Sequence, residues 1–169
     1  MPLSQADFNR WVTDHGPALY RVAYRLVGDR HEAEDAVQEA FRSAWKSRAL
    51  FQVGRSERAW LAAILRRRIV DRFRRGNLPA VSAGDHAIEV GVEGDDPLYH
   101  DYTDEMQRAL GALPKDLREA LLLVVVGELT HPEAADLLGL PLGTVLSRVS
   151  RARTKLREIL LARAQGEKV

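Results

Sequence analysis

The chain has 169 residues, of which 46% are hydrophobic and 29% charged, and it contains no cysteine. This length accommodates one ordinary domain or two small ones. The lack of cysteine excludes disulfides, thiolate zinc sites and cysteine nucleophiles, and the scattered histidines have no ligand spacing, so we expect no metal and no cofactor. No apolar run approaches the roughly 20 residues that span a bilayer, and the polar N-terminus lacks a signal-peptide core. We therefore expect a cytoplasmic protein without membrane insertion.

The formal net charge of +1 hides three blocks of opposite sign. Residues 1–78 hold 15 Lys and Arg against 9 Asp and Glu, residues 79–114 hold 1 against 8, and residues 115–169 hold 9 against 7. Two basic blocks therefore flank an acidic one. Such asymmetry is typical of chains that contact nucleic acid.

Helical periodicity fills both basic blocks, and no stretch of the sequence shows the sustained alternation of a strand. The segment between the blocks is rich in Gly, Pro and acidic residues and has no apolar period. We therefore predict an all-α chain of two small helical domains, residues 1–77 and 101–169, joined by a flexible acidic linker over residues 78–100.

The first domain begins with apolar positions between Phe8 and Leu26, which predict one or two helices that end near Gly28. Asp29 and Glu32 have the spacing of a capping box and predict the start of another helix. Apolar residues recur on one face of this helix at steps of three and four, which predicts that this face is core. The opposite face is polar and carries Glu34, Asp35, Gln38, Glu39 and Arg42.

A long basic helix is predicted next, from an N-cap at Ser56 to Arg75. It is expected to bury Trp60, Leu61, Ile64 and Leu65, and it carries Arg66, Arg67, Arg68, Arg72, Arg74 and Arg75. Arginines at this density attract phosphates by releasing counterions, whereas the plainer interpretation is a solvated face. Phe51 and Trp60 offer stacking surface for unpaired bases, although aromatic residues at helical spacing are more often core.

The second domain carries a helix-turn-helix pattern. A helix over 113–127 offers apolar residues for packing, namely Leu117, Ala120, Leu121, Val124 and Val125. Thr130 and Glu133 form another capping box. Ala135, Gly139 and Val145 then supply a small residue where two helices touch, a glycine for the turn and an aliphatic anchor for the second helix.

The second helix of this motif has an inward apolar face and a polar outer face. The inward residues are Val145, Val149, Ala152 and Leu156, and the outer ones are Thr144, Ser147, Arg148, Arg151 and Lys155. Arginine binds guanine with two hydrogen bonds, and hydroxyls bond bases or phosphates. The pattern favours a helix that enters a DNA groove. The alternative is an ordinary helical hairpin with a wet basic face.

These residues resemble a known family. The segments AEDAVQEAF (33–41) and DRFRR (71–75), with Trp60 and Leu61 between them, resemble region 2 of bacterial extracytoplasmic function (ECF) sigma factors. The segments GLPLGTV (139–145) and RARTKLR (151–157) resemble region 4 of the same family. The resemblance covers nearly all of the chain outside the linker.

The resemblance implies a dissociable subunit of bacterial RNA polymerase that directs promoter recognition and transcription initiation. Region 4 would bind the minus-thirty-five element as duplex through Thr144, Ser147, Arg148, Arg151 and Lys155. Region 2 would bind the non-template strand of the minus-ten element through Phe51, Arg66, Arg67, Arg72, Arg74 and Arg75. Asp35, Gln38 and Glu39 would dock on core polymerase at the β′ clamp helices, and region 4 would contact the β flap.

The chain departs from the family pattern at three places: Leu146 replaces a usual Lys, Arg67 replaces a common Asn, and residues 131–134 are HPEA. These departures bear on which promoter sequence the protein would recognise, and not on its assignment to the class of sigma factors. No further region follows the region 4 match, so we expect control by a separate partner such as an anti-sigma factor.

Two other functional classes are the alternatives. A conventional helix-turn-helix regulator would bind two half-sites as a dimer and would have no use for the Asp35 face, whereas a sigma factor would act as a monomer on core polymerase. An enzyme is disfavoured because no nucleophile triad, phosphate-binding glycine loop or carboxylate pair stands out in the sequence.

Overall fold

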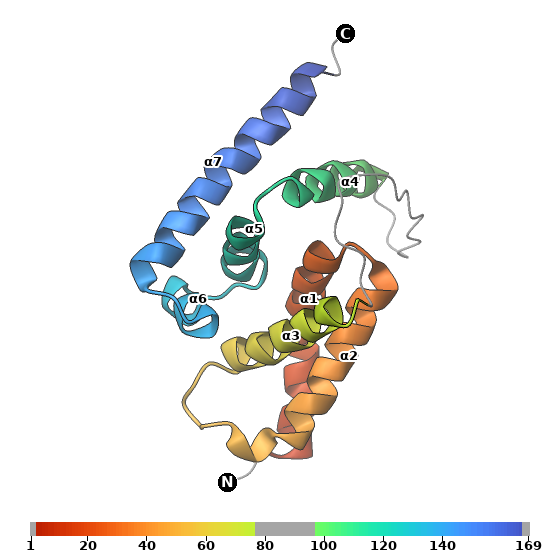
Figure 1. Cartoon of the computed structure of the whole chain (residues 1–169). Coiled ribbons are helices and arrows are strands. Elements are labelled where there is room, and N and C mark those ends of the chain that lie inside the picture. Colours follow the sequence, from red (N-terminus) through yellow and green to blue (C-terminus); the bar gives the residue numbers. More distant parts are fainter. Residues whose placement is uncertain (1–2, 77–96, 167–169) are drawn as a thin grey trace.

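The computed structural model describes residues 3–76 and 97–166, with side chains from residue 104 in the second range. Every regular element in these two ranges is helical, which confirms the all-α prediction. Figure 1 shows the helices of the N-terminal half packed side by side and the C-terminal half ending in a protruding helix. Most of the predicted linker lies outside the described residues, and the first helix of the C-terminal half already starts at Pro97.

The N-terminal half (residues 3–76) consists of α1 (Gln5–Val27), α2 (Arg30–Lys46), a short 3-10 turn (Arg48–Leu50) and α3 (Glu57–Arg74). Their ends are set by local chemistry. Asp29 and Ser56 cap α2 and α3 by accepting backbone N–H groups at 2.9 and 3.2 Å. Gly28 ends α1 at a φ of 78°, in the left-handed region that glycine adopts without steric cost.

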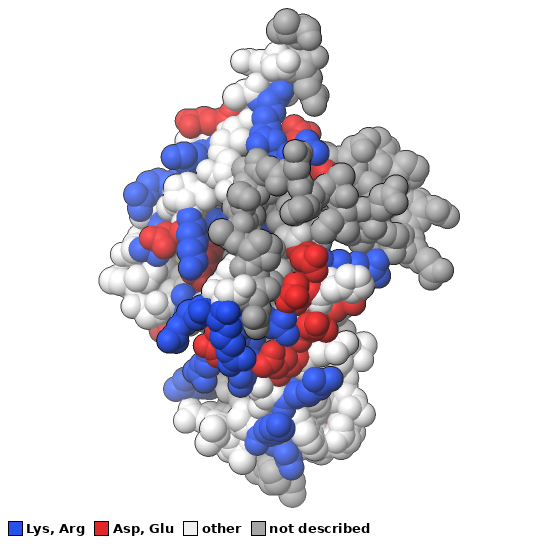
Figure 2. Space-filling model, turned by 45° about the vertical axis from the view of Figure 1, so that its right-hand side comes forward, with Lys and Arg blue, Asp and Glu red and all other residues white. Residues whose placement is uncertain are grey.

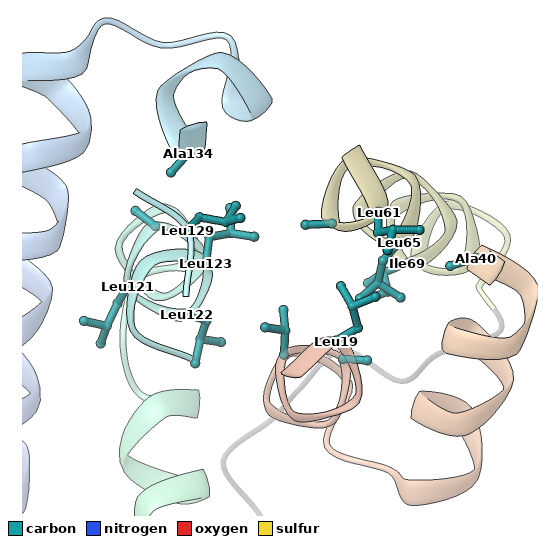
Figure 3. Close-up of a cluster of buried hydrophobic side chains, with 14 of the residues drawn as sticks. Leu19, Ala40, Leu61, Leu65, Ile69, Leu121, Leu122, Leu123, Leu129 and Ala134 are labelled. Atoms are coloured by element: carbon teal, nitrogen blue, oxygen red, sulfur yellow. The ribbon is translucent and has the colours of Figure 1, made fainter. Parts of the chain in front are cut away.

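Alanines let the helices of the N-terminal half approach closely. Ala33, Ala36, Ala40 and Ala44 lie along one face of α2 and are at most 2% exposed. Both α1 and α3 pack against α2 and against each other. Of the four residues of α3 predicted to be buried, Trp60 and Ile64 are half-buried. Leu61 and Leu65 are buried as predicted and, with Ile69, complete this core. Figure 3 shows these side chains pointing toward Leu19 of α1.

The C-terminal half (residues 97–166) contains α4 (Pro97–Gly111), α5 (Lys115–Leu121), a π-helical segment (Leu122–Val126), α6 (His131–Leu138) and α7 (Leu142–Gly166). Both α5 and α6 pack on α7.

One packing prediction in the C-terminal half is wrong. Val125, expected to be buried, is 49% exposed, while Leu122 and Leu123 are buried. Val125 lies in the π-helical segment, in which the Gly127 N–H bonds to the Leu122 carbonyl at 2.8 Å, and this wider turn breaks the α-helical period on which the prediction depends.

Candidate nucleic-acid interfaces

The helix-turn-helix of the C-terminal half is built by its caps. The Thr130 hydroxyl accepts the Glu133 N–H at 3.2 Å, and the Glu133 carboxylate accepts the Thr130 N–H at 2.8 Å, which confirms the capping box. Gly139 then ends α6 at a φ of 65°. This left-handed conformation explains why the turn needs glycine.

The titration of Glu133 reflects its capping contacts. Burial raises the pKa of Glu133, but hydrogen bonds from the Thr130 N–H and from the Ser56 and Thr130 hydroxyls, together with the charge of Arg58, outweigh burial and lower it. Ser56 and Arg58 belong to the N-terminal half. Glu133 therefore has contacts in both halves of the molecule.

The predicted groove-binding face lies on α7. Val145, Val149 and Ala152 are at most 3% exposed and anchor the helix. On its other side Ser147, Arg151 and Lys155 are exposed, while Thr144 and Arg148 are half-buried. All five predicted residues thus come from the one helix that the buried row holds in place.

A pocket between α5 and α7 contains part of that face. It is lined by Pro114, Asp116, Leu117, Arg148, Ser150, Arg151, Thr154, Lys155 and Glu158. An Arg148 nitrogen lies 3.8 Å from an Asp116 oxygen. This pairing was not expected from the sequence, because the two residues are 32 positions apart.

The predicted strand-binding arginines of α3 and its C-cap, Arg75, divide into two groups. Arg67, Arg74 and Arg75 are exposed. The side chain of Arg72 is only 19% exposed, and its nitrogens lie 2.5 Å from Glu32 and 3.4 Å from Glu39. Arg66, the remaining predicted residue, pairs with Glu119 of the C-terminal half. Figure 2 accordingly shows acidic side chains beside the basic ones in its lower half.

The structure places Phe51 in an aromatic cluster. Its ring centroid lies 4.8 Å from that of Trp11 and 5.3 Å from that of Trp60, both edge-on. Phe51 and Trp60 are half-buried and Trp11 is 2% exposed, so this cluster is part of the core. The apolar side chains that the same loop exposes are Leu50 and Val53, at 76% and 84%. The exposure of Leu50 and Val53 is not predicted in the sequence analysis. The one sign of it in the sequence is that both apolar residues lie close to Gly54, in a loop.

The polar face of α2 is exposed at Asp35 and Gln38. Glu39 is half-buried and lies 3.7 Å from Arg68 and 3.4 Å from Arg72. Sequence reasoning also missed an apolar groove between α1 and α2. It begins beside Gln38 and is lined by Gln5, Phe8, Asn9, Val12, Gln38, Phe41, Arg42 and Trp45. Helical periodicity predicts only that its aromatic residues are core.

Within residues 3–76 and 97–166, no group of three or more His, Cys, Asp or Glu residues is placed to hold a metal ion. No helix within those ranges has the length and apolar character needed to span a bilayer.

Two family models match the chain. The model for Sigma-70 region 2 covers residues 11–78, and the model for region 4 of the same family covers residues 103–156. The two matches follow the division into N-terminal and C-terminal halves.

Curated relatives match most of the chain. It is 36% identical over 164 residues to the ECF RNA polymerase sigma factor SigE of Mycolicibacterium smegmatis. The match covers 92% of this chain and 63% of SigE, so this chain spans less than two thirds of the length of that relative. It is 31% identical to SigW of Bacillus subtilis (84% of this chain, 82% of that one) and 33% identical to CnrH of Cupriavidus metallidurans (93% and 88%).

Solved structures share the arrangement of helices. The sigma factor RpoE of Bartonella quintana, in complex with the anti-sigma factor NepR, superposes with a TM-score of 0.73 at 31% identity, covering 91% of this chain and 96% of that one. CnrH in complex with the cytosolic domain of CnrY gives 0.70 at 31% identity, with 94% and 90% covered. Two region matches in order, relatives above 30% identity and a shared fold lead to one conclusion: this chain belongs to the ECF RNA polymerase sigma factors and serves in promoter-specific transcription initiation.

Proposed function

We propose that the C-terminal half binds the minus-thirty-five element as duplex through the outer face of α7. The observation that carries this proposal is the anchoring of α7: its buried row of Val145, Val149 and Ala152 fixes which side faces outward. The residues that would contact the groove are Thr144, Ser147, Arg148, Arg151 and Lys155. Arg148 would bind a base edge, because its planar guanidinium can form two parallel hydrogen bonds. Lys155 would bind a phosphate, because its ammonium group acts as a point charge.

The N-terminal half would bind the separated non-template strand of the minus-ten element. Arg67, Arg74 and Arg75 are exposed and are the direct candidates for phosphate contact. Arg66 and Arg72 hold carboxylates in this structure, so each would have to exchange its partner for a phosphate. Phe51 would act by holding its loop against Trp11 and Trp60.

Core polymerase would dock on Asp35, Gln38 and Glu39 of α2. The groove beside Gln38 supports this proposal, because it adds the apolar surface of Phe8, Phe41 and Trp45 to a polar face. The β′ clamp helices are the proposed partner of this face, and the β flap is the proposed partner of the C-terminal half.

An anti-sigma factor is the proposed regulator. Two solved relatives, RpoE of Bartonella quintana and CnrH, were captured with NepR and with the cytosolic domain of CnrY. We further propose that the chain acts in the cytoplasm, as a monomer and without catalytic activity of its own, since polymerase would supply the chemistry.

Reconstitution with core polymerase tests these proposals together. The chain should co-purify with core enzyme and direct transcription from a subset of fragments in a genomic promoter library. Asp35→Arg should reduce assembly. A chain that ignores core enzyme but binds a palindrome as a dimer would instead be a conventional helix-turn-helix regulator.

A further inference from the structure

The first two turns of α7 carry two exposed leucines among polar residues. Leu142 is 44% exposed and Leu146 is 47% exposed. A spacing of four residues places both on the same side of the helix, one turn apart. One exposed leucine is ordinary on a protein surface, but two in register form a continuous apolar strip. This pair, the leucine strip, faces solvent in the described structure.

The leucine strip lies beside a row of short side chains. Gly143, Ser147 and Ser150 are exposed, and steps of three and four residues keep them on one side of α7. A Cβ added at Gly143 would meet nothing within 4 Å, so the space over this turn is open. Since each residue turns the helix by about 100°, Leu146 projects beside this row. A surface that approaches the short row closely would therefore touch Leu146.

The opposite edge of this face is basic. Arg148 and Lys155 line the pocket between α5 and α7, and Leu146 does not belong to that pocket. The face thus has a charged edge next to α5, short side chains in the middle and an apolar edge. The major groove of DNA, about 12 Å wide, admits an α-helix with its side chains, so both edges would lie in the groove.

The chemistry of leucine limits what Leu146 can bind there. Its side chain has no hydrogen-bond donor or acceptor, so it bonds neither a phosphate nor a polar base edge. Its favourable contact is apolar. The 5-methyl group of thymine is the apolar group that base pairs present in the major groove. A leucine at this edge therefore suits thymine, whereas a cytosine at the same position would leave it without an apolar partner.

We propose that Leu146 packs on the 5-methyl group of one thymine in the bound duplex, with Leu142 beside it, and so acts as a specificity-determining residue. The proposal rests on the duplex-binding function proposed for α7. It adds selection by apolar contact to the hydrogen bonds expected from Arg148. The contact buries about one methyl group, which corresponds to an affinity ratio of about threefold to fivefold.

Deoxyuridine tests this contact, because it pairs with adenine as thymidine does and lacks only the 5-methyl group. The chain is assembled with core polymerase, and a promoter is taken from the genomic library. Each thymine of its upstream duplex element is then replaced by deoxyuridine, one at a time. Anisotropy of the fluorescein-labelled promoter fragment should show a threefold to fivefold loss of affinity at one of these thymines.

Substitutions in the chain connect this loss to Leu146. With Leu146→Ala, the holoenzyme should bind the thymine promoter about threefold to fivefold more weakly and should no longer distinguish deoxyuridine at that position. Leu146→Met keeps an apolar side chain and should retain the distinction. Leu161→Ala is the matched control, because Leu161 is 53% exposed on the same helix but 15 positions further along, and it should behave as the unmodified chain. Circular dichroism checks that each variant keeps its helices.

A charge at the same position should have a different effect. Leu146→Lys replaces the apolar contact with a point charge that can reach a phosphate. The holoenzyme should then bind promoter and unrelated duplexes more tightly, and its affinity should depend on salt more steeply, by about one in the slope of log K against log salt. The distinction between thymine and deoxyuridine should be lost.

The outcomes separate the contact from the function on which it rests. If no deoxyuridine replacement in the upstream element weakens binding, or if Leu146→Ala keeps the loss, the methyl contact is overturned. If Leu146→Ala leaves promoter affinity unchanged but weakens assembly with core polymerase, the leucine strip binds protein and the proposal is also overturned. If the holoenzyme selects no promoter at all, the duplex-binding function proposed for α7 fails, and the contact fails with it.

Discussion

The two basic helices differ in how available their arginines are. On α3, Arg66, Arg68 and Arg72 each lie within 4 Å of a carboxylate, from Glu119, Glu39 and Glu32 respectively. On the proposed groove face of α7, Arg148 also lies within 4 Å of a carboxylate, at 3.8 Å from Asp116, whereas Arg151 and Lys155 are exposed. The number of arginines on a helix therefore says little about how many can meet a phosphate. The variants below test this difference between the helices, in order of decreasing effect.

The largest effect is expected from Val145→Asp. Val145 lies on the buried face of α7 and is fully buried, so a carboxylate there should destabilise the C-terminal half by more than about 4 kcal/mol. The variant should lose duplex binding, while its N-terminal helices stay folded. Thermal unfolding followed by circular dichroism measures the loss. Leu146→Asp is the matched control, because the neighbouring Leu146 is 47% exposed. Equal stability of the two variants would show that α7 is not anchored through Val145.

Arg148→Ala tests whether the half-buried arginine of α7 binds a base. We expect duplex affinity to fall by about 1–3 kcal/mol on the recognised promoter sequence, measured by fluorescence anisotropy. Arg153→Ala is the control, since Arg153 is exposed but lies off the proposed face. A uniform loss on all duplexes would assign Arg148 to a phosphate and make it equivalent to the exposed arginines of α3.

Asp35→Arg tests the docking face of the N-terminal half. Asp35 is exposed, so the fold should remain intact while affinity for core polymerase falls about tenfold, or ~1.4 kcal/mol. Titration of labelled protein with core enzyme measures the effect. Asp14→Arg, an exposed charge reversal on α1, should have none. Retained core affinity in the Asp35 variant would remove this residue from the docking face.

The smallest effect is expected from Glu133→Gln, at about 1 kcal/mol of stability at neutral pH. The pKa of Glu133 in the folded chain is below its ordinary value of 4.5. Its stabilising contribution is therefore complete above about pH 4.5 and is lost as the pH falls through the lowered pKa. Melting temperatures of both proteins between neutral and acid pH should converge at low pH. A constant difference would mean that the charge of Glu133 does not stabilise the cap.

Local chemistry explains what could be predicted from the sequence. Asp29, Ser56 and Thr130 each cap a helix with their own side chain, and Gly139 ends one through its own backbone freedom. These signals lie within a few residues of the feature they determine. The buried row of α7 could be found for the same reason, since periodicity is a local property.

Contacts between distant residues could not be predicted in this way. Arg66 and Glu119 are 53 positions apart, and nothing in either segment indicates the other. The burial of Phe51 depends on Trp11 of α1, which is 40 positions away in the sequence. The exposure of Val125 depends on a π-turn, for which a run of leucines and valines gives no sign. The contacts of the candidate site residues therefore required the structure, although their positions on the helices did not.

The π-helical segment between α5 and α6 has a geometric consequence. A π-turn contains about one residue more than an α-turn, so the chain leaves it rotated by about 100° relative to a continuous α-helix. Leu129, just beyond the segment, is 3% exposed and belongs to the apolar core. The single extra residue thus changes the direction in which the chain leaves the helix. Chain length at this point, more than the identity of any side chain, sets the direction in which the helix-turn-helix leaves the body of the molecule.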